Sequence, residues 1–301
     1  MNRPPSPSEQ PSMERWRPVW EQQMATRPPH LRWSFPDQTL YNSANEARKV
    51  VRILGQHGIP CCITGVKALC YYGAPRLCTT LEFCVPTEHL GAANDIFSAS
   101  PANVIYLPWR GRHPELEGRD GRSLYHTFPR FRLNHEGPLF DFRLVPSSDW
   151  RFECVPDNFE YSAQHELPYP KLRLFAQSLL ERQDLGDLQD LVDGMDLTEQ
   201  WGEENLKFGE HGEEYTRWLA EKNAKIREAL PQEVKDEVLN DMLGTEIYEL
   251  DEEPPDFRET FVYLTQTKEG RIGLETPAEL YATKYRAKGS PDPRTLIRFS
   301  V

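Results

Sequence analysis

The amino-acid sequence predicts an α/β (α+β) fold, with a small mixed sheet flanked by helices and followed by a helical C-terminal region. Two hydrophobic patterns support this prediction. Apolar residues recur at helical spacing between Ser43 and Leu54, and from Leu81 to Val85 they alternate with Glu82 and a thiol, as in a strand. After Tyr169 the apolar positions keep helical spacing with short interruptions, which indicates a helical region following the sheet.

The first 40 residues are predicted to form an irregular arm. Eight prolines lie between Pro4 and Pro36, and they prevent long regular structure. Trp16, Trp20 and Trp33 are interleaved with them, so we expect part of the arm to pack on the body of the protein. The sequence shows neither a long apolar run nor an apolar segment near its start. We therefore expect a cytoplasmic protein without a membrane span.

Residues 41–165 are predicted to form the α/β core. Its first helix begins near Ser43, a residue type that favours helix N-termini. Further helices are expected over residues 66–72 and 87–97, and strands over 59–63, 81–85, 104–107 and 139–145. The intervening segment 108–133 is predicted to be rich in loops, and it is basic. It is either a solvated loop that balances acidic parts of the chain or a flap that faces phosphate or another polyanion.

Residues 166–250 are predicted to be helical, and residues 251–301 to form an acidic linker and a tail. The expected helices cover residues 172–180, 187–191, 201–206, 215–230 and 234–243. The linker, residues 251–256, is broken by prolines. In the tail we expect a short strand over residues 261–264 and a helix over residues 277–284.

The charge distribution disfavours RNA or tRNA as a partner without excluding it. The net charge is −12, and between Glu181 and Glu259 acids outnumber bases by about three to one. Nucleic-acid-binding proteins usually carry the opposite sign. A nucleotide or another small molecule is the expected partner, and the oligomeric state cannot be predicted. Of the six cysteines, five lie between residues 61 and 84 without any CxxC pair, so reduced core thiols are expected in place of a zinc site.

The stretch from Ile63 to Val85 carries the strongest functional signal. It reads as a strand, a glycine turn at Gly65, a short helix, a loop and a second strand that contains Glu82. A glycine turn at the start of a helix suits phosphate, and a carboxylate opposite it suits a divalent cation. Asp141 lies centrally in a later predicted strand. If that strand neighbours the first, Glu82 and Asp141 can share one cation.

These residues resemble the nucleotidyltransferase superfamily, whose members share the polymerase-beta-like fold. The resemblance covers roughly residues 45–195 and is closest to the small cytosolic type of antitoxin and abortive-infection systems. The motif matches are Gly65, Ala68, Gly73, Arg76, Glu82 and Asp141. The chain also resembles fungal proteins with similar helical tails. The resemblance implies catalysis and metal binding by Glu82 and Asp141, with Mg²⁺ or Mn²⁺ as the cation. It also implies phosphate binding by Gly65, Lys67, Arg76 and Thr80.

Two departures from the family motif bear on activity. Val66 stands where the family has a second glycine or a serine, and Thr80 stands where it has the first strand carboxylate. Two cations facing a triphosphate need about three carboxylates, whereas Glu82 and Asp141 alone remain. Both acids also have an alternative role, because buried acids are usually ion-paired, here with Arg76 or Arg143.

Three functions remain open at this stage. The first is nucleotidyl transfer from a nucleoside triphosphate with a divalent cation. The second is a non-catalytic binding or regulatory module of the same fold. The third is a repurposed transferase that forms amide bonds in small-molecule biosynthesis, with a tRNA-borne acyl group as one donor. Each requires Glu82 and Asp141 to lie side by side, facing the helix that opens after Gly65.

Overall fold

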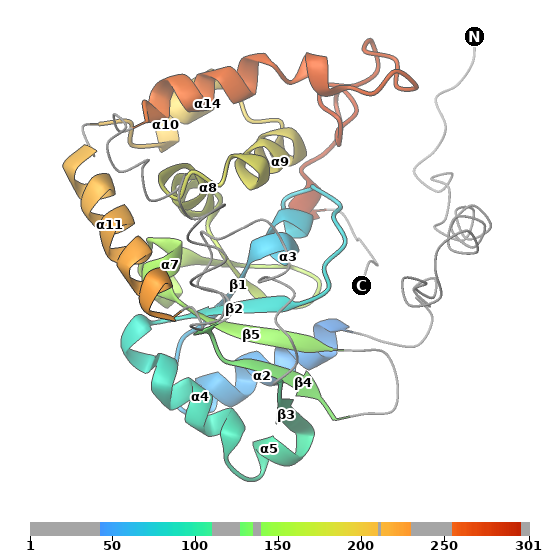
Figure 1. Ribbon diagram of the computed structural model, residues 1–301. Coiled ribbons are helices and arrows are strands. Elements are labelled where there is room, and N and C mark those ends of the chain that lie inside the picture. Colours follow the sequence, from blue (N-terminus) through green and yellow to red (C-terminus); the bar gives the residue numbers. More distant parts are fainter. Residues whose placement is uncertain (1–42, 110–126, 135–139, 210–211, 230–254, 296–301) are drawn as a thin grey trace, which may run out of the picture. The chain divides into compact units, whose positions relative to one another are not determined.

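A five-stranded mixed sheet lies at the centre of the computed structural model (Figure 1). The structure describes residues 43–109, 127–134, 140–209, 212–229 and 255–295. The strands are β1 (Cys62–Thr64), β2 (Leu81–Val85), β3 (Tyr106–Pro108), β4 (Arg130–Leu133) and β5 (Asp141–Pro146), in the spatial order β1-β2-β5-β4-β3. β2 and β5 are parallel, and the other neighbours are antiparallel. A separate two-stranded ribbon pairs β6 (Phe159–Tyr161) with β7 (Pro168–Pro170).

One face of the sheet is an aromatic core. Phe142 of β5 lies at its centre, with its ring centroid 5.0 Å from that of Phe97 and 5.4 Å from that of Tyr106. Phe83 and Phe131 pack against the same ring from the neighbouring strands. The helices α2 (Ser43–Gln56), α4 (Leu90–Ser98) and α5 (Ala102–Ile105) lie on this side of the sheet (Figure 1). Burying these rings supplies the main hydrophobic stabilisation of the sheet.

The helical region lies on the other side of the sheet, next to α3 (Gly65–Tyr71) (Figure 1). Its helices are α8 (Leu172–Glu181), α9 (Leu185–Met195), α10 (Glu199–Asn205), α11 (Gly212–Ala229) and α14 (Phe257–Gln266). Shorter helical turns are η4 (Thr87–His89), α7 (Ser147–Trp150), η6 (Pro156–Asn158), η8 (Glu269–Arg271) and η9 (Pro293–Thr295). The prediction of a mixed α/β fold with a helical C-terminal region is thus confirmed.

The end of α3, the end of α9 and η9 meet at a pair of glycines. Gly73 adopts a φ of +94°, and a Cβ at this position would lie 2.6 Å from the carbonyl oxygen of Gly194 and 2.8 Å from Pro293. A Cβ at Gly194 would lie 2.6 Å from the carbonyl oxygen of Tyr72. Both positions therefore require glycine, for close backbone approach and, at Gly73, also for its left-handed conformation.

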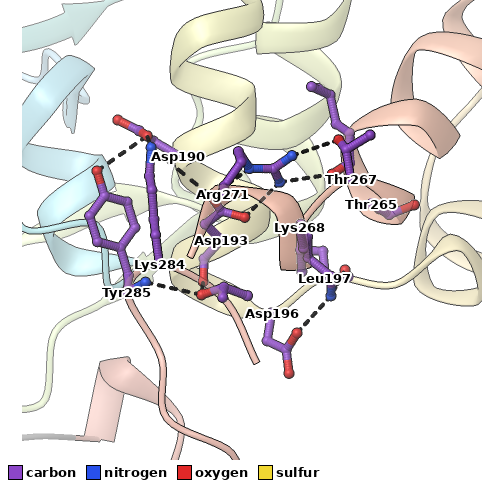
Figure 2. A network of polar contacts seen from close by, with 12 residues as sticks. Asp190, Asp193, Asp196, Leu197, Thr265, Thr267, Lys268, Arg271, Lys284 and Tyr285 are labelled. Atoms are coloured by element: carbon purple, nitrogen blue, oxygen red, sulfur yellow. Dashed lines mark hydrogen bonds and ion pairs between the residues drawn. The ribbon is translucent and has the colours of Figure 1, made fainter. Parts of the chain in front are cut away.

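Three members of an aspartate stripe along α9, Asp190, Asp193 and Asp196, hold the C-terminal segment (Figure 2). The aspartate stripe recurs at every third residue: Asp187, Asp190, Asp193 and Asp196. Asp193 is fully buried and accepts two hydrogen bonds from Arg271, of 2.8 Å from Nε and 2.6 Å from Nη2. Neighbours at this spacing lie about one turn apart, so the stripe winds partway around α9 and ends at Asp196, the C-cap of the helix. Part of the acidity seen in the sequence therefore serves internal ion pairs.

The neighbours of Asp193 in the stripe are also paired with the C-terminal segment. Lys284 Nζ lies 2.6 Å from Asp190 Oδ1, and the hydroxyl of Tyr285 lies 3.2 Å from the same oxygen. Lys268 Nζ lies 2.6 Å from Asp196 Oδ1 (Figure 2). Residues 257–285 thus dock on α9 mainly through charge-assisted hydrogen bonds, which are stronger than those between neutral groups.

Several predicted elements differ in the structure. The strand expected over residues 261–264 is part of α14, because Phe257, Phe261 and Leu264 are buried at helical spacing. The helix expected over residues 277–284 is replaced by turns and a bridge between Tyr281 and Ala287. β4 lies within the segment predicted to be rich in loops. The arm over residues 1–40 and the helix over residues 234–243 lie outside the described residues. None of the described helices is both long and apolar enough to cross a membrane.

Candidate functional site

Five charged residues share the sheet face opposite the aromatic core. Glu82 of β2 is the register partner of Arg143 on β5, and Asp141 lies two residues before Arg143 on the same strand. On β4, Arg130 is the partner of Arg143, and Arg132 is the partner of Asp141. Register partners point to the same face of a sheet, as do residues two apart on one strand. We call this set, Glu82, Arg130, Arg132, Asp141 and Arg143, the arginine–carboxylate face.

The carboxylate of Glu82 lies directly against the first residue of α3. Gly65 has a φ of +61°, and a Cβ at this position would lie 2.8 Å from both Cδ and Oε2 of Glu82. Glycine is therefore needed both for the backbone conformation and for the close approach of the carboxylate. The structure thus brings Glu82 to the helix start and places Asp141 on the neighbouring strand and the same face.

Asp141 is held by two arginines of β4. Its carboxylate is 6 % exposed and accepts hydrogen bonds from Arg132, of 2.6 Å from Nε to Oδ1 and 2.9 Å from Nη2 to Oδ2. Arg130 Nη2 donates to Oδ2 over 3.3 Å. Paired contacts of this kind between one guanidinium and one carboxylate are among the stronger polar interactions in proteins. Asp141 is therefore ion-paired, and Arg130 and Arg132 of β4 are the partners that hold it.

Arg130 joins Asp141 to the position where the family motif has its first carboxylate. Its Nη2 atom donates a hydrogen bond of 2.9 Å to Oγ1 of Thr80 as well as the bond to Asp141. The Arg130 side chain is only 10 % exposed. A guanidinium thus contacts two of the three positions at which the resemblance expects metal-binding carboxylates, Thr80 and Asp141. Both oxygens of Asp141 accept hydrogen bonds from arginines, and Thr80 carries no charge. The roles of Glu82 and Asp141 in metal binding and catalysis remain predictions.

Trp109 stacks on the outer side of Arg132. The guanidinium carbon lies 3.3 Å from the centroid of the indole ring. Cation–π stacking adds to the hydrogen bonds to Asp141, and the two together restrict the side chain to one orientation. Arg132 still keeps 25 % of its side chain exposed. It is therefore the member of the arginine–carboxylate face for which accessibility to a ligand is best supported.

Arg76 lies away from this face, against the aspartate stripe of α9. Its Nη1 atom donates a hydrogen bond to Oδ1 of Asp187 and lies 3.4 Å from Oδ2 of Asp190. Burial raises the pKa of Asp187 to about 6, since the nearby Arg76 offsets only part of the cost of desolvation. Arg76 thus braces the loop before β2 in the described structure. The phosphate-binding roles of Gly65, Lys67, Arg76 and Thr80 remain predictions.

Sequence reasoning placed the two arginines of β4 in a basic, loop-rich segment and did not connect them with Asp141. The order Arg130, Phe131, Arg132, Leu133 alternates between polar and apolar residues, which is a strand pattern. It was hidden at the end of a long basic segment. The other members of that segment, from Arg110 to His126, lie outside the described residues. The basic flap remains a prediction for that part.

The fold and the site define a mixed α/β protein whose sheet carries an arginine–carboxylate face. Comparisons with known protein families, curated proteins and solved structures do not assign a function to the chain. No family model matches the chain, and no curated protein matches it. One similar solved structure is a protein from H. pylori that is provisionally assigned as a nucleotidyltransferase, with 16 % identity. The match covers 75 % of this chain and 93 % of that one, at a TM-score of 0.29. A TM-score this low carries no argument, so function has to be argued from the residues.

Proposed function

We propose that this protein is a non-catalytic binding module with a nucleotidyltransferase-like fold, and that it binds a phosphate-bearing ligand such as a nucleotide without a divalent cation. The observation that carries the proposal is the position of Arg130, whose guanidinium contacts both Thr80 and Asp141. A bound cation would have to displace it from the carboxylate. The fixed positive charge of the arginine takes the place of a metal ion in offsetting phosphate charge.

The charge balance of the face supports this proposal. Three guanidinium groups, those of Arg130, Arg132 and Arg143, stand against the two carboxylates of Glu82 and Asp141. The sum is one positive charge, whereas a catalytic site with about three carboxylates is negative before its cations bind. A positive face attracts a polyphosphate directly, and planar guanidinium groups can bind phosphate through paired hydrogen bonds.

One observation favours a second candidate, cation-dependent nucleotidyl transfer. The carboxylate of Glu82 lies against Gly65 and shares a sheet face with Asp141, as the family motif requires. For transfer to occur, Asp141 would first have to leave its two arginines. The two candidates therefore differ in whether nucleotide binding depends on a divalent cation.

Isothermal titration calorimetry with ATP, CTP, GTP and UTP tests the proposal. Each titration is run with EDTA and again with Mg²⁺ or Mn²⁺. We expect at least one nucleotide to bind in EDTA, and we expect the affinity to fall when Arg132 is changed in Arg132→Gln. The matched control is Arg258→Gln, which removes an exposed arginine of α14 whose side chain is 53 % exposed. Binding that needs the cation and is lost in Glu82→Gln would favour transfer. Absence of binding under all conditions would refute the binding module.

A second experiment asks whether Arg130 is what excludes the cation. Thr80→Asp restores the carboxylate of the family motif, but Arg130 would neutralise it. We therefore expect no gain in Mn²⁺ binding from Thr80→Asp alone and a clear gain when it is combined with Arg130→Ala. Mn²⁺ binding followed by electron paramagnetic resonance measures this. An equal gain in the single variant would show that Arg130 has no such role.

A further inference from the structure

Three cysteine thiols converge beside the sheet although they lie far apart in the sequence. Cys62 of β1 and Cys84 of β2 are register partners, so their side chains share one sheet face. Cys154 joins them from the segment after α7. The three Sγ atoms lie within 4.8 Å of one another. We call this set the thiol cluster.

The thiol cluster is closed off from solvent and is fixed by the fold. Cys62 and Cys84 are fully buried, and Cys154 is 3 % exposed. The Cys154 thiol lies 3.2 Å from the backbone carbonyl oxygen of Cys84, to which it donates. The strands are hydrogen-bonded to each other, and the nearby α7 is tied to α8 by a hydrogen bond from Ser178 to the carbonyl of Trp150. The fold therefore brings sulfur atoms from three separate segments close together.

We propose that Cys62, Cys84 and Cys154 bind one soft metal ion, with monovalent copper as the ion that fits best. Thiolates select copper(I) and zinc over harder cations. Structural zinc almost always takes four ligands, whereas the cluster among the described residues has three members. Copper(I) has no such requirement for a fourth ligand, so three sulfurs suit it better. The thiol cluster lies on the same side of the sheet as the arginine–carboxylate face, since Cys84 is two residues after Glu82 on β2, but the two sets share no residue. The proposal does not depend on the proposed function.

The geometry requires little movement for binding. Metal–sulfur bonds of about 2.3 Å in a trigonal arrangement place the sulfurs about 4 Å apart. The observed separations of up to 4.8 Å therefore need shifts below about 1 Å. Each thiol gives up its proton to solvent as its bond to the metal forms, and the metal keeps its oxidation state. The positive charge of the ion offsets part of the buried thiolate charge.

The competing explanation is that these cysteines are ordinary hydrophobic core residues, as the lack of a CxxC pair suggested. Cys61 separates the two explanations. It is 5 % exposed and directly precedes Cys62, yet it is not a member of the thiol cluster. Cys61→Ala thus removes a thiol of similar burial from the same segment. A comparison with Cys154→Ala isolates the effect of cluster membership from the effect of losing a buried sulfur.

The test uses the full chain, purified anaerobically in the reduced state and titrated with copper(I) in competition with a chromophoric copper(I) chelator. We expect one equivalent to bind and to raise the melting temperature, with both effects retained in Cys61→Ala and lost in Cys154→Ala. Circular dichroism establishes that the variants fold. If Cys154→Ala does not fold, Cys154→Ser replaces it, because the serine hydroxyl can still donate to the carbonyl oxygen of Cys84 while the sulfur ligand is removed. Failure of the wild-type protein to bind copper(I) would overturn the proposal, and binding of zinc alone would overturn the choice of ion.

Discussion

Removing the arginine that pairs with Asp193 should destabilise the protein strongly. Arg271 supplies two hydrogen bonds, of 2.8 and 2.6 Å, to a carboxylate that is 0 % exposed. Breaking a buried ion pair from one side costs about 3–5 kcal/mol, because the remaining charge stays buried without compensation. Lys284 Nζ lies 4.0 Å from Asp193 Oδ2 and can take over part of the charge. We therefore expect Arg271→Ala to lower the free energy of unfolding by about 3 kcal/mol.

Urea unfolding followed by circular dichroism measures this loss. With an m-value of about 3 kcal/mol per molar urea, a loss of this size lowers the midpoint by about 1 M. The control is Arg258→Ala in α14, whose side chain is 53 % exposed and pairs with Glu203 over 2.6 Å. Such an exposed pair contributes at most about 1 kcal/mol. Asp193→Asn combined with Arg271→Ala should recover part of the loss. If Arg271→Ala and Arg258→Ala shift the midpoint equally, the reasoning about the buried pair is wrong.

Three further predictions follow from backbone and burial. Gly65→Ala should lower stability by about 1–3 kcal/mol, because its Cβ would lie 2.8 Å from the Glu82 carboxylate and its φ is +61°; an unchanged melting temperature would contradict this. Gly202→Ala should lower the free energy of unfolding by about 1–3 kcal/mol, because its Cβ would lie only 2.4 Å from the ring of Phe261. An unchanged midpoint in urea unfolding would contradict this. Burial raises the pKa of Asp187 from 3.8 to about 6, so the folded protein binds this proton more tightly than the unfolded chain does. The protein should therefore lose stability as the pH rises from 4 to 6. The loss is about 3 kcal/mol, and Asp187→Asn should lack it; equal pH slopes in the two proteins between pH 4 and 7 would disprove the assignment.

The core of the sheet was predictable because its hydrophobic patterns are local. The alternation from Leu81 to Val85 matches β2, and the helical spacing after Ser43 matches α2. The tail was not predictable in this way. The four residues from Phe261 to Leu264 fit a strand and a helix equally well. The burial of Phe257 on the same helix face as Phe261 and Leu264 identifies the helix, and this is visible only in the structure.

Only the acidic residues of the candidate site could be predicted from the sequence. Glu82 and Asp141 stand out as polar residues within apolar strands, so the sequence indicates them. Their partners depend on which strand pairs with which. Arg132 reaches Asp141 because β4 is antiparallel to β5, and the sequence contains no local signal for that pairing. The thiol cluster depends in the same way on tertiary structure, since about 70 residues separate Cys154 from Cys84.

The docking of residues 257–295 on α9 has a practical consequence for anyone who shortens this chain. A fragment that ends at the acidic linker would lose the C-terminal partners of Asp190, Asp193 and Asp196, namely Lys284, Arg271 and Lys268. It would also lose Pro293, which lies against Gly73. Such a fragment would expose a row of negative charge and a bare glycine surface, and it would tend to aggregate or be degraded. Loss of any activity on C-terminal deletion would then report a folding defect and could not be taken to locate a functional site.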